Sequence, residues 1–390
     1  MRDLMRGLAV GAVLAVAVAG CSSPTAAPRD DAAKGPVKVG LVYSKTGALA
    51  SYGKLYAEGF RAGLDYATKG TGKVNGRAVD VTEADDAGDP AKAVSAATDL
   101  IGKGTQILAG STASGVALQV APVAEQNKVL FVSGPAATDA VTGINKHTFR
   151  SGRQTTQDVR TAAQFIGDAK GKKIVVFAQD NAFGKANVDG VRAVLGPEGA
   201  TVEGLLVPAA ATDLTPFAVQ AKAAKADLLY VAWAGATANA MWSALGQQGV
   251  LDTTTVVTGL DIRASYAAYG PIVGKVNLLS HYFAGAAGTD VEKAMTDRVT
   301  KAGGEVDLFT VDGFTAAQLV VHAVEAGGDD VAAMVKALEG WSFDGVKGRL
   351  TVRAGDHALL QPMFQAKLDA SGPVLVKRID AGTVAPPEKK

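Results

Sequence analysis

The sequence predicts an α/β protein with two lobes, each built on a doubly wound parallel sheet. Short segments rich in Val, Ile and Leu alternate with Ala-rich segments whose apolar residues recur at helical spacing. This alternation is typical of right-handed βαβ units around parallel sheets. The pattern occurs in two successive sets, and the 390-residue chain is too long for one ordinary domain. We therefore expect two α/β lobes.

The first set of elements occupies residues 37–132. Its first helix carries Leu55, Phe60 and Leu64 at helical spacing. Its second helix opens at Asp89-Pro90, where aspartate suits the N-cap and proline suits the first helical position. The expected strands are 37–43, 77–83, 106–109 and 129–132, and the expected helices are 51–68, 89–101 and 113–126.

The second set begins near residue 155 and repeats the same rhythm. Thr215-Pro216 marks the start of one of its helices. The expected strands are 173–178, 201–207, 227–232 and 254–257, and the expected helices are 156–169, 183–195, 215–225 and 238–248.

The last third of the chain departs from this rhythm. Late helices are followed by β-hairpin material, so we expect these segments to complete both lobes, with the chain crossing between them more than once. The expected strands are 276–283, 348–352, 363–368 and 374–379, and the expected helices are 290–302, 311–326 and 329–338.

The N-terminus indicates export. Residues 8–19 are apolar apart from Gly11, a run of ~12 residues that suits a signal peptide and is short for a ~30 Å bilayer core. Val18-Ala19-Gly20-Cys21 resembles the lipobox of bacterial lipoproteins, which implies a signal peptide over 1–20 and acylation of Cys21. The alternative is a plain secretory signal. Cys21 is the only cysteine, so no intramolecular disulfide can form.

Both ends of the mature chain have tail-like composition. Residues 21–36 lack large apolar side chains and are rich in Pro, Ala, Asp and Ser, which predicts a flexible tether. Residues 381–390 are expected to form a frayed tail.

Composition excludes several classes of protein. The net charge is +1 and no basic stripe occurs, which argues against nucleic acid as a partner. Beyond the signal no apolar run approaches 18 residues, so membrane attachment is expected through the lipid alone.

The parts of an enzyme are missing from the sequence. It contains no Gly-x-Ser-x-Gly elbow and no Walker A loop, and its four histidines are widely separated. Asp85, Asp86 and Asp89 suit an N-cap cluster better than a calcium site. We predict no catalysis, no metal and no cofactor.

Two loops favour a binding site instead. Gly110–Gly115 and Ser133–Thr138 lie at strand-to-helix junctions of adjacent strands, where α/β sheets bind ligands. Backbone N–H groups, hydroxyls and a helix N-terminus together suit an anion, so they predict a carboxylate cradle without a positively charged residue. For each loop alone, the alternative is that its Ser and Thr residues only cap the helix that follows. Because the two loops follow adjacent strands, we favour a binding site.

Eight segments of the chain together indicate a known family. They are Val39–Leu41, Thr46-Gly47, Ser51–Gly53, Asp85–Pro90 with Ala93, Gly110–Pro122, Val132–Thr142, His147–Arg150 and Asp180–Lys185. Each segment alone is a loose match, but their order and spacing are specific. On these segments, the chain from residue 37 to about 379 resembles the periplasmic leucine/isoleucine/valine-binding protein family, the type I solute-binding receptors of ABC importers.

The resemblance implies the periplasmic binding protein type I fold, with ligand held between two lobes. Three crossovers join the lobes, and we place them near Ser151, Ser280 and Trp341. The implied division is lobe 1 over 37–151 plus 281–341 and lobe 2 over 152–280 plus 342–380.

The resemblance also implies site residues. Ser114 and Thr138, with the backbone near Ala136, would hold an α-carboxylate. The aromatic residue of the first loop corresponds to Tyr52, and Asp261 would take the α-ammonium.

Two positions depart from the family pattern. Phe183 stands where many relatives have tyrosine, and Ala232-Trp233-Ala234-Gly235 replaces a Gly-Gly-Tyr segment. Phe183 and Trp233 are therefore expected at an altered second half of the site, with core packing as the alternative for Trp233. An aromatic acid, amide or urea-type solute is thus an alternative to a branched-chain amino acid.

The resemblance implies a monomeric receptor, lipid-anchored on the outer side of the cell membrane. It would deliver a small solute to an ABC permease and its ATPase subunits. A ligand sensor that feeds a signalling partner is the second alternative, and an exported hydrolase is the third.

Overall fold

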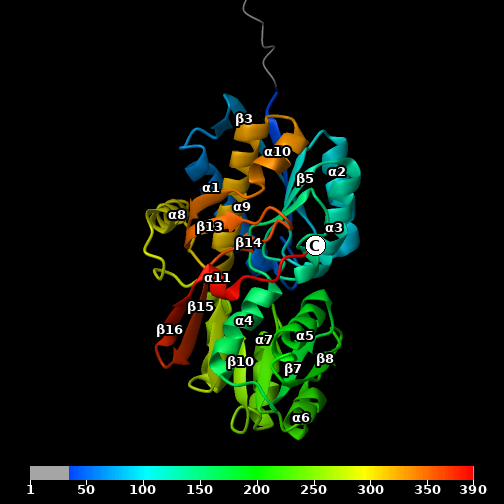
Figure 1. Ribbon diagram of the computed structural model, residues 1–390, viewed down its shortest axis with the longest axis vertical. Coiled ribbons are helices and arrows are strands. Elements are labelled where there is room, and N and C mark those ends of the chain that lie inside the picture. Colours follow the sequence, from blue (N-terminus) through cyan, green and yellow to red (C-terminus); the bar gives the residue numbers. More distant parts are fainter. Residues whose placement is uncertain (1–34, 390) are drawn as a thin grey trace, which may run out of the picture. The chain divides into compact units, whose positions relative to one another are not determined.

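The computed structural model describes residues 35–389 (Figure 1). The predicted signal peptide, Cys21 and all but the end of the predicted tether lie outside the described residues. Among residues 35–389, no helix has both the length and the apolar character needed to cross a bilayer.

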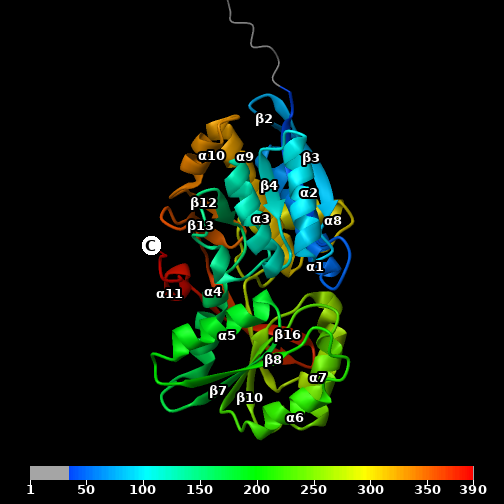
Figure 2. The same cartoon turned by 90° about the vertical axis from the view of Figure 1, so that its right-hand side faces the viewer.

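The first lobe contains a six-stranded sheet in the order β2-β3-β1-β4-β5-β6. All neighbouring strands are parallel except β2, which pairs antiparallel with β3. Helices cover both faces of the sheet (Figure 2). One apolar cluster joins the sheet to α1 and to the later helix α9 (Leu308–Gly327), and another joins it to α2 and α3. The elements are β1 (Val37–Tyr43), α1 (Ala50–Ala67), β2 (Lys73–Val74), β3 (Arg77–Asp85), α2 (Pro90–Gly102), β4 (Ile107–Gly110), α3 (Ser114–Asn127), β5 (Leu130–Ser133), η1 (Asp139–Val141) and β6 (Thr148–Arg150).

The second lobe contains a seven-stranded sheet in the order β16-β15-β11-β10-β9-β7-β8. Its strands are parallel apart from β15 and β16, which close one edge as an antiparallel hairpin. The elements are α4 (Thr155–Ile166), β7 (Lys173–Gln179), α5 (Ala182–Leu195), β8 (Thr201–Val207), α6 (Thr215–Ala223), β9 (Leu228–Ala232), α7 (Ala238–Gln247), β10 (Thr255–Gly259), η2 (Arg263–Ile272), β11 (Val276–Ser280), β15 (Met363–Asp369) and β16 (Gly372–Ile379). The expected α/β class with two mainly parallel sheets is confirmed.

Three later helices return to the first lobe: α8 (Asp290–Lys301), α9 (Leu308–Gly327) and α10 (Val331–Leu338). Helix α9 is buried along most of its length and packs closely against α1. A Cβ atom on Gly59 of α1 would lie 1.9 Å from the Thr310 carbonyl oxygen of α9, so only glycine permits this approach.

The third crossover lies later than expected. Strands β12 (Ser342–Gly345), β13 (Gly348–Val352) and β14 (Leu359–Leu360) form a separate three-stranded sheet. Phe343, Leu350 and Leu359 join the apolar core of the first lobe. The assignment of 342–360 to lobe 2 and the crossover near Trp341 are therefore wrong, and the chain crosses at residues 361–362. Apolar alternation predicts that a strand is buried, but not in which of two cores.

The C-terminal segment is docked rather than frayed. It forms α11 (Ala381–Val384), which lies beside α4 (Figure 1). Val384 is fully buried with Met363 and Ile379. Arg353 Nη1 donates to the Pro386 carbonyl at 2.8 Å, so the segment contacts both lobes.

Buried polar side chains connect the crossovers to one another. Gln157 Nε2 donates to the Leu359 carbonyl at 3.1 Å, and Gln361 Nε2 donates to Gln157 Oε1 at 3.3 Å. Lys347 Nζ donates to the His281 carbonyl at 2.8 Å. These bonds satisfy polar groups where the chain leaves one sheet for the other.

Candidate functional site

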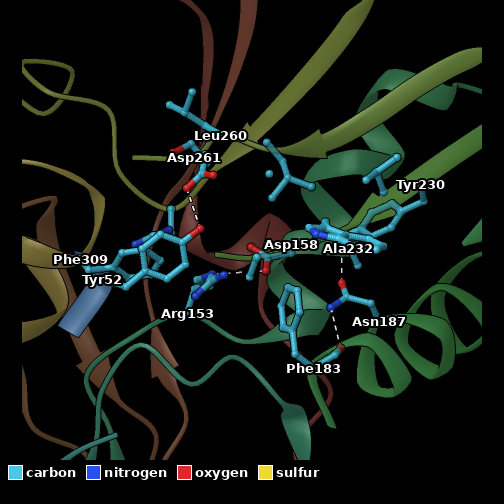
Figure 3. Close-up of a pocket in the computed structure, with 17 residues that line it drawn as sticks. Tyr52, Arg153, Asp158, Phe183, Asn187, Tyr230, Ala232, Leu260, Asp261 and Phe309 are labelled. Atoms are coloured by element: carbon cyan, nitrogen blue, oxygen red, sulfur yellow. Dashed lines mark hydrogen bonds and ion pairs between the residues drawn. The ribbon is translucent and has the colours of Figure 1, made fainter. Parts of the chain in front are cut away.

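A cleft between the lobes has two connected parts. The inner chamber is lined by Tyr52, Arg153, Asp158, Asn187, Tyr230, Trp233, Asp261, Ser280, His281, Phe309 and their neighbours (Figure 3). The outer mouth is lined by Thr112, Ser114, Ala137, Asn181 and their neighbours. Tyr52, Arg153, Phe183, Ala234 and Phe309 line both parts.

The lining residues of the second lobe lie at the carboxyl ends of parallel strands. Trp233 follows β9, Asp261 follows β10 by two residues, and Ser280 ends β11. Open α/β sheets bind ligands at this edge, because loops there can vary without disturbing the core.

The two lobes meet inside the cleft at Tyr52. Its hydroxyl donates to Asp261 Oδ1 at 2.7 Å and accepts a bond from the Gly235 backbone N–H at 3.1 Å. Burial raises the pKa of Tyr52 well above its ordinary value, so the hydroxyl remains a donor. Gly235 has φ +84°, and a Cβ there would lie 2.6 Å from the Ala48 carbonyl oxygen of the first lobe. Glycine therefore suits both the backbone conformation and the contact.

Asp261 lies in the inner chamber and is already well bonded. Its Oδ1 accepts from Tyr52 and from the Ile262 backbone N–H at 2.7 Å. Burial is the main cause of its raised pKa. Its position is compatible with the predicted role toward an ammonium, and that role stays a prediction.

The predicted carboxylate cradle is only partly exposed to the cleft. Ser114 begins α3 and lines the outer mouth. Its Oγ accepts the Thr138 backbone N–H at 3.3 Å, which leaves the hydroxyl hydrogen free to donate. Thr138 and Ala136 line neither the inner chamber nor the outer mouth. The Ala136 N–H donates to the Ser111 carbonyl at 3.2 Å, and Thr138 Oγ1 accepts from Ala140 N–H at 3.3 Å.

A cation lies behind this loop, although the sequence predicted a cradle without one. The fully buried Arg150 donates from Nη1 to the Thr138 carbonyl at 2.9 Å and from Nη2 to the Ala136 carbonyl at 2.5 Å. Burial lowers the pKa of Arg150 to about 10, so the group is still charged at neutral pH. Its role here is to hold the loop through backbone carbonyls.

Sequence reasoning missed a charged pair in the chamber. Arg153 Nε lies 3.3 Å from Asp158 Oδ2, and Arg153 Nη1 donates to the Pro135 carbonyl at 2.9 Å. Burial raises the pKa of Asp158 to about 6. Arg153 precedes α4 and Asp158 lies in its first turn. Two charged residues so soon after a predicted crossover were the available signal in the sequence.

Aromatic side chains form the chamber walls. Tyr52 packs on Phe309 with ring centroids 4.5 Å apart, and Phe183 lines both parts of the cleft. Trp233 stacks on Phe177, with centroids 5.7 Å apart, and donates from Nε1 to Thr237 Oγ1 at 2.9 Å. It therefore both packs on the core and lines the chamber, so the two interpretations of Trp233 are compatible.

Metal-ligating clusters are absent from the part of the chain that the structure describes: no three His, Cys, Asp or Glu side chains gather closely enough. Asp89 caps α2 by accepting from the Ala91 and Lys92 backbone N–H groups, as the sequence predicted. The cleft instead combines aromatic walls with a few directed polar groups, an arrangement that suits a small solute.

Comparison with known proteins agrees with this geometry. Residues 36–373 match the family described as "Periplasmic binding protein". Leu/Ile/Val-binding protein homolog 3 of Brucella melitensis is 26% identical over 343 residues, which is 85% of this chain and 91% of the relative. An ABC-type branched-chain amino acid transporter structure from Rhodopseudomonas palustris is 32% identical, with a TM-score of 0.75, and covers 91% of this chain and 100% of that chain.

A second solved structure shares the fold at lower identity. It is a solute-binding protein of an R. palustris ABC transporter in complex with 4-hydroxybenzoate, 21% identical, with a TM-score of 0.80 over 88% of this chain and 97% of that chain. The family match spans most of the chain, and the structural relative at 32% identity is covered in full. The chain therefore belongs to the periplasmic binding protein family and is a solute receptor rather than an enzyme.

Proposed function

We propose that this solute-binding protein of an ABC transporter encloses an amino acid or a related small carboxylate between its lobes and delivers it to the permease. The observation that carries the proposal is a pair of hydrogen bonds between the lobes, inside a cleft lined from both sides: the Tyr52 hydroxyl of the first lobe donates to Asp261 and accepts from the Gly235 N–H of the second. A ligand that contacts both lobes stabilises the closed form, because only that form offers both sets of contacts.

A carboxylate on the solute is supported by Ser114, which begins α3, lines the outer mouth and has a hydroxyl hydrogen free to donate. An amino acid as the solute is supported by Asp261, whose carboxylate could take the α-ammonium. It is also supported by the names of the relatives, which include a branched-chain amino acid transporter and Leu/Ile/Val-binding proteins. An aromatic acid is the second candidate, because Tyr52, Phe183 and Phe309 line the cleft and proteins with this fold are described with 4-hydroxybenzoate and benzoate.

Thermal unfolding of the purified protein against a solute panel tests the proposal. The panel contains branched-chain, aromatic and polar L-amino acids, benzoate-like acids, short amides and urea. A ligand at a hundred times its Kd adds ~2.7 kcal/mol, which raises the unfolding midpoint by a few degrees. A shift with L-amino acids alone supports the amino acid, and a shift with acids that lack an ammonium supports the second candidate. No shift with any carboxylate would overturn the proposal.

We further propose that Cys21 anchors the receptor on the outer side of the cell membrane through a lipid. Replacing the thiol, Cys21→Ala, should move the protein from the membrane fraction to the soluble fraction. Persistence of the variant in the membrane fraction would contradict this anchor.

A further inference from the structure

We infer that Asp158 and Arg153 form a recognition subsite for a carboxamide or ureido group on the solute. This inference rests on the proposed function and names the polar group that such a solute would carry besides its carboxylate. Such a group presents an N–H donor beside a carbonyl acceptor, and the two side chains present an acceptor beside a donor.

The acceptor is Asp158 Oδ1. Asp158 lines the inner chamber with only 3% of its surface exposed. Its Oδ2 lies against Arg153 Nε at 3.3 Å, while Oδ1 is buried and has no hydrogen-bond partner among the described residues. A buried carboxylate oxygen without a partner costs free energy, and a donor supplied by the solute would recover it.

The donor is Arg153 Nη2. Nη1 is bonded to the Pro135 carbonyl and Nε faces Asp158, while Nη2 makes no hydrogen bond within residues 35–389. The guanidinium lies over the Phe309 ring, 5.7 Å from its centroid, which holds the plane in place. Arg153 also lines both the inner chamber and the outer mouth, so it faces the space that a solute fills (Figure 3).

The other polar side chains of the chamber have partners in the described structure. Asn187 uses both ends of its amide, since Nδ2 donates to the Phe183 carbonyl at 2.9 Å and Oδ1 accepts from Tyr230 at 3.1 Å. The remaining bonds are Trp233 Nε1 to Thr237, Tyr52 Oη to Asp261, Ser280 Oγ to the Tyr282 carbonyl and His281 Nε2 to the Leu308 carbonyl. Within residues 35–389, Asp158 Oδ1 is thus the one buried side-chain polar atom of the chamber lining that lacks a partner, and Arg153 beside it has an Nη2 that makes no hydrogen bond.

Matched solute pairs test this subsite by titration calorimetry on the purified protein. Succinamate is compared with 4-methylpentanoate, and L-asparagine with L-leucine, because each pair exchanges a carboxamide for an isopropyl group of similar shape. We expect the wild type to bind at least one amide ten or more times as tightly as its apolar partner. The succinamate pair lacks an ammonium, so its result is independent of Asp261.

The variant Asp158→Asn should abolish this preference. Its amide oxygen would face Arg153, so its NH₂ group would replace the acceptor Oδ1 with a donor. Asp189→Asn removes one carboxylate from an exposed position on α5, outside the chamber, and should leave the preference unchanged. If Asp158→Asn fails to fold, Arg153→Lys serves instead, because lysine keeps the charge and loses the planar fork.

Equal affinity for both members of each pair, or a preference that survives in the variant, would overturn the subsite. If L-leucine or benzoate binds and the amides bind no better, the proposed function stands and this inference alone fails. If no carboxylate of either panel binds, both fail.

Discussion

Tyr52 and Asp261 are 209 residues apart in the sequence, yet the Tyr52 hydroxyl donates a 2.7 Å hydrogen bond to the Asp261 carboxylate. The same oxygen accepts from the Gly235 backbone, and the ring packs on Phe309 of the first lobe. One side chain of α1 is thus fixed by its own lobe and bonded twice to the other.

We predict that Tyr52→Phe weakens solute binding with little effect on folding. The ring contact with Phe309 remains, while both hydrogen bonds between the lobes are lost. A hydrogen bond to a charged group contributes ~1.5–3 kcal/mol, so the closed form loses at least that bond to Asp261. Affinity for a solute found in the panel should fall about tenfold or more, as measured by calorimetry.

Tyr43→Phe is the matched control for this prediction. It removes a hydroxyl that donates to Glu83 Oε2 at 2.8 Å within the first lobe, away from the cleft. Equal losses of affinity in the two variants would show that the bond between the lobes has no special role.

The two hydroxyls of the predicted cradle should respond differently to removal. Ser114→Ala deletes a donor at the outer mouth and should lower affinity for a carboxylate about tenfold. Thr138→Ala deletes the Oγ1 that accepts from Ala140 N–H, and Thr138 lies outside the cleft lining. It should therefore lower the unfolding midpoint more than the affinity. Affinity is measured by calorimetry and stability by thermal unfolding. If Thr138→Ala lowers the affinity more than the unfolding midpoint, Thr138 contacts the ligand after all.

Local patterns predicted the long elements well. Helix α2 begins where Asp89-Pro90 indicates, and the strands of both parallel sheets lie within a few residues of their expected positions. The short elements β2, β6, β12 and β14 were not predicted, because two to four residues carry too little periodicity. The third crossover was misplaced because the burial of Leu350 does not reveal in which core it lies.

The site was predicted from loops rather than from charges. Tyr52, Phe183, Trp233 and Asp261, which the resemblance named as ligand-binding residues, line the inner chamber, and Ser114 lines the outer mouth. Their contact with a ligand stays a prediction. Arg153 and Asp158 belong to no motif in the sequence. They were found only from the burial of Asp158 and from the contact between the two side chains, which the fold creates at the start of α4.

Removal of the C-terminal segment should destabilise the protein. A chain ending at Asp380 loses the buried Val384 and the carbonyls that accept from Arg160 and Arg353. Burial of one valine contributes ~1.5–3 kcal/mol, so the unfolding midpoint should fall by several degrees. A chain ending at Ala385 keeps Val384 and should lose less. Equal midpoints for the shortened and full chains would mean that the docked segment does not contribute to stability.

The last prediction concerns the pH dependence of stability. Burial raises the pKa of Asp158 to about 6; the charges of Arg153 and Arg150 oppose this rise, and the charge of Asp139 adds to it. An unfolded aspartate titrates near ~3.9, so between about pH 4 and about pH 6 the folded protein binds more protons than the unfolded chain. The stability that this proton uptake provides is fully present below about pH 4 and is lost as pH rises through about 6.

The variant Asp158→Asn has no titrating group at this position. Its stability should therefore fall less than that of the wild type as pH rises. The removed contribution amounts to at most about 3 kcal/mol, from two pKa units at ~1.4 kcal/mol each. Unfolding of wild type and variant is compared at pH 4, 5, 6 and 7, with Asp189→Asn as the control for removal of an exposed charge. The wild type should lose stability relative to the variant as pH rises from about 4 to about 6. If the stabilities of wild type and variant change in parallel with pH, Asp158 titrates alike in the folded and unfolded protein. Burial of Asp158 would then not be a source of stability at low pH.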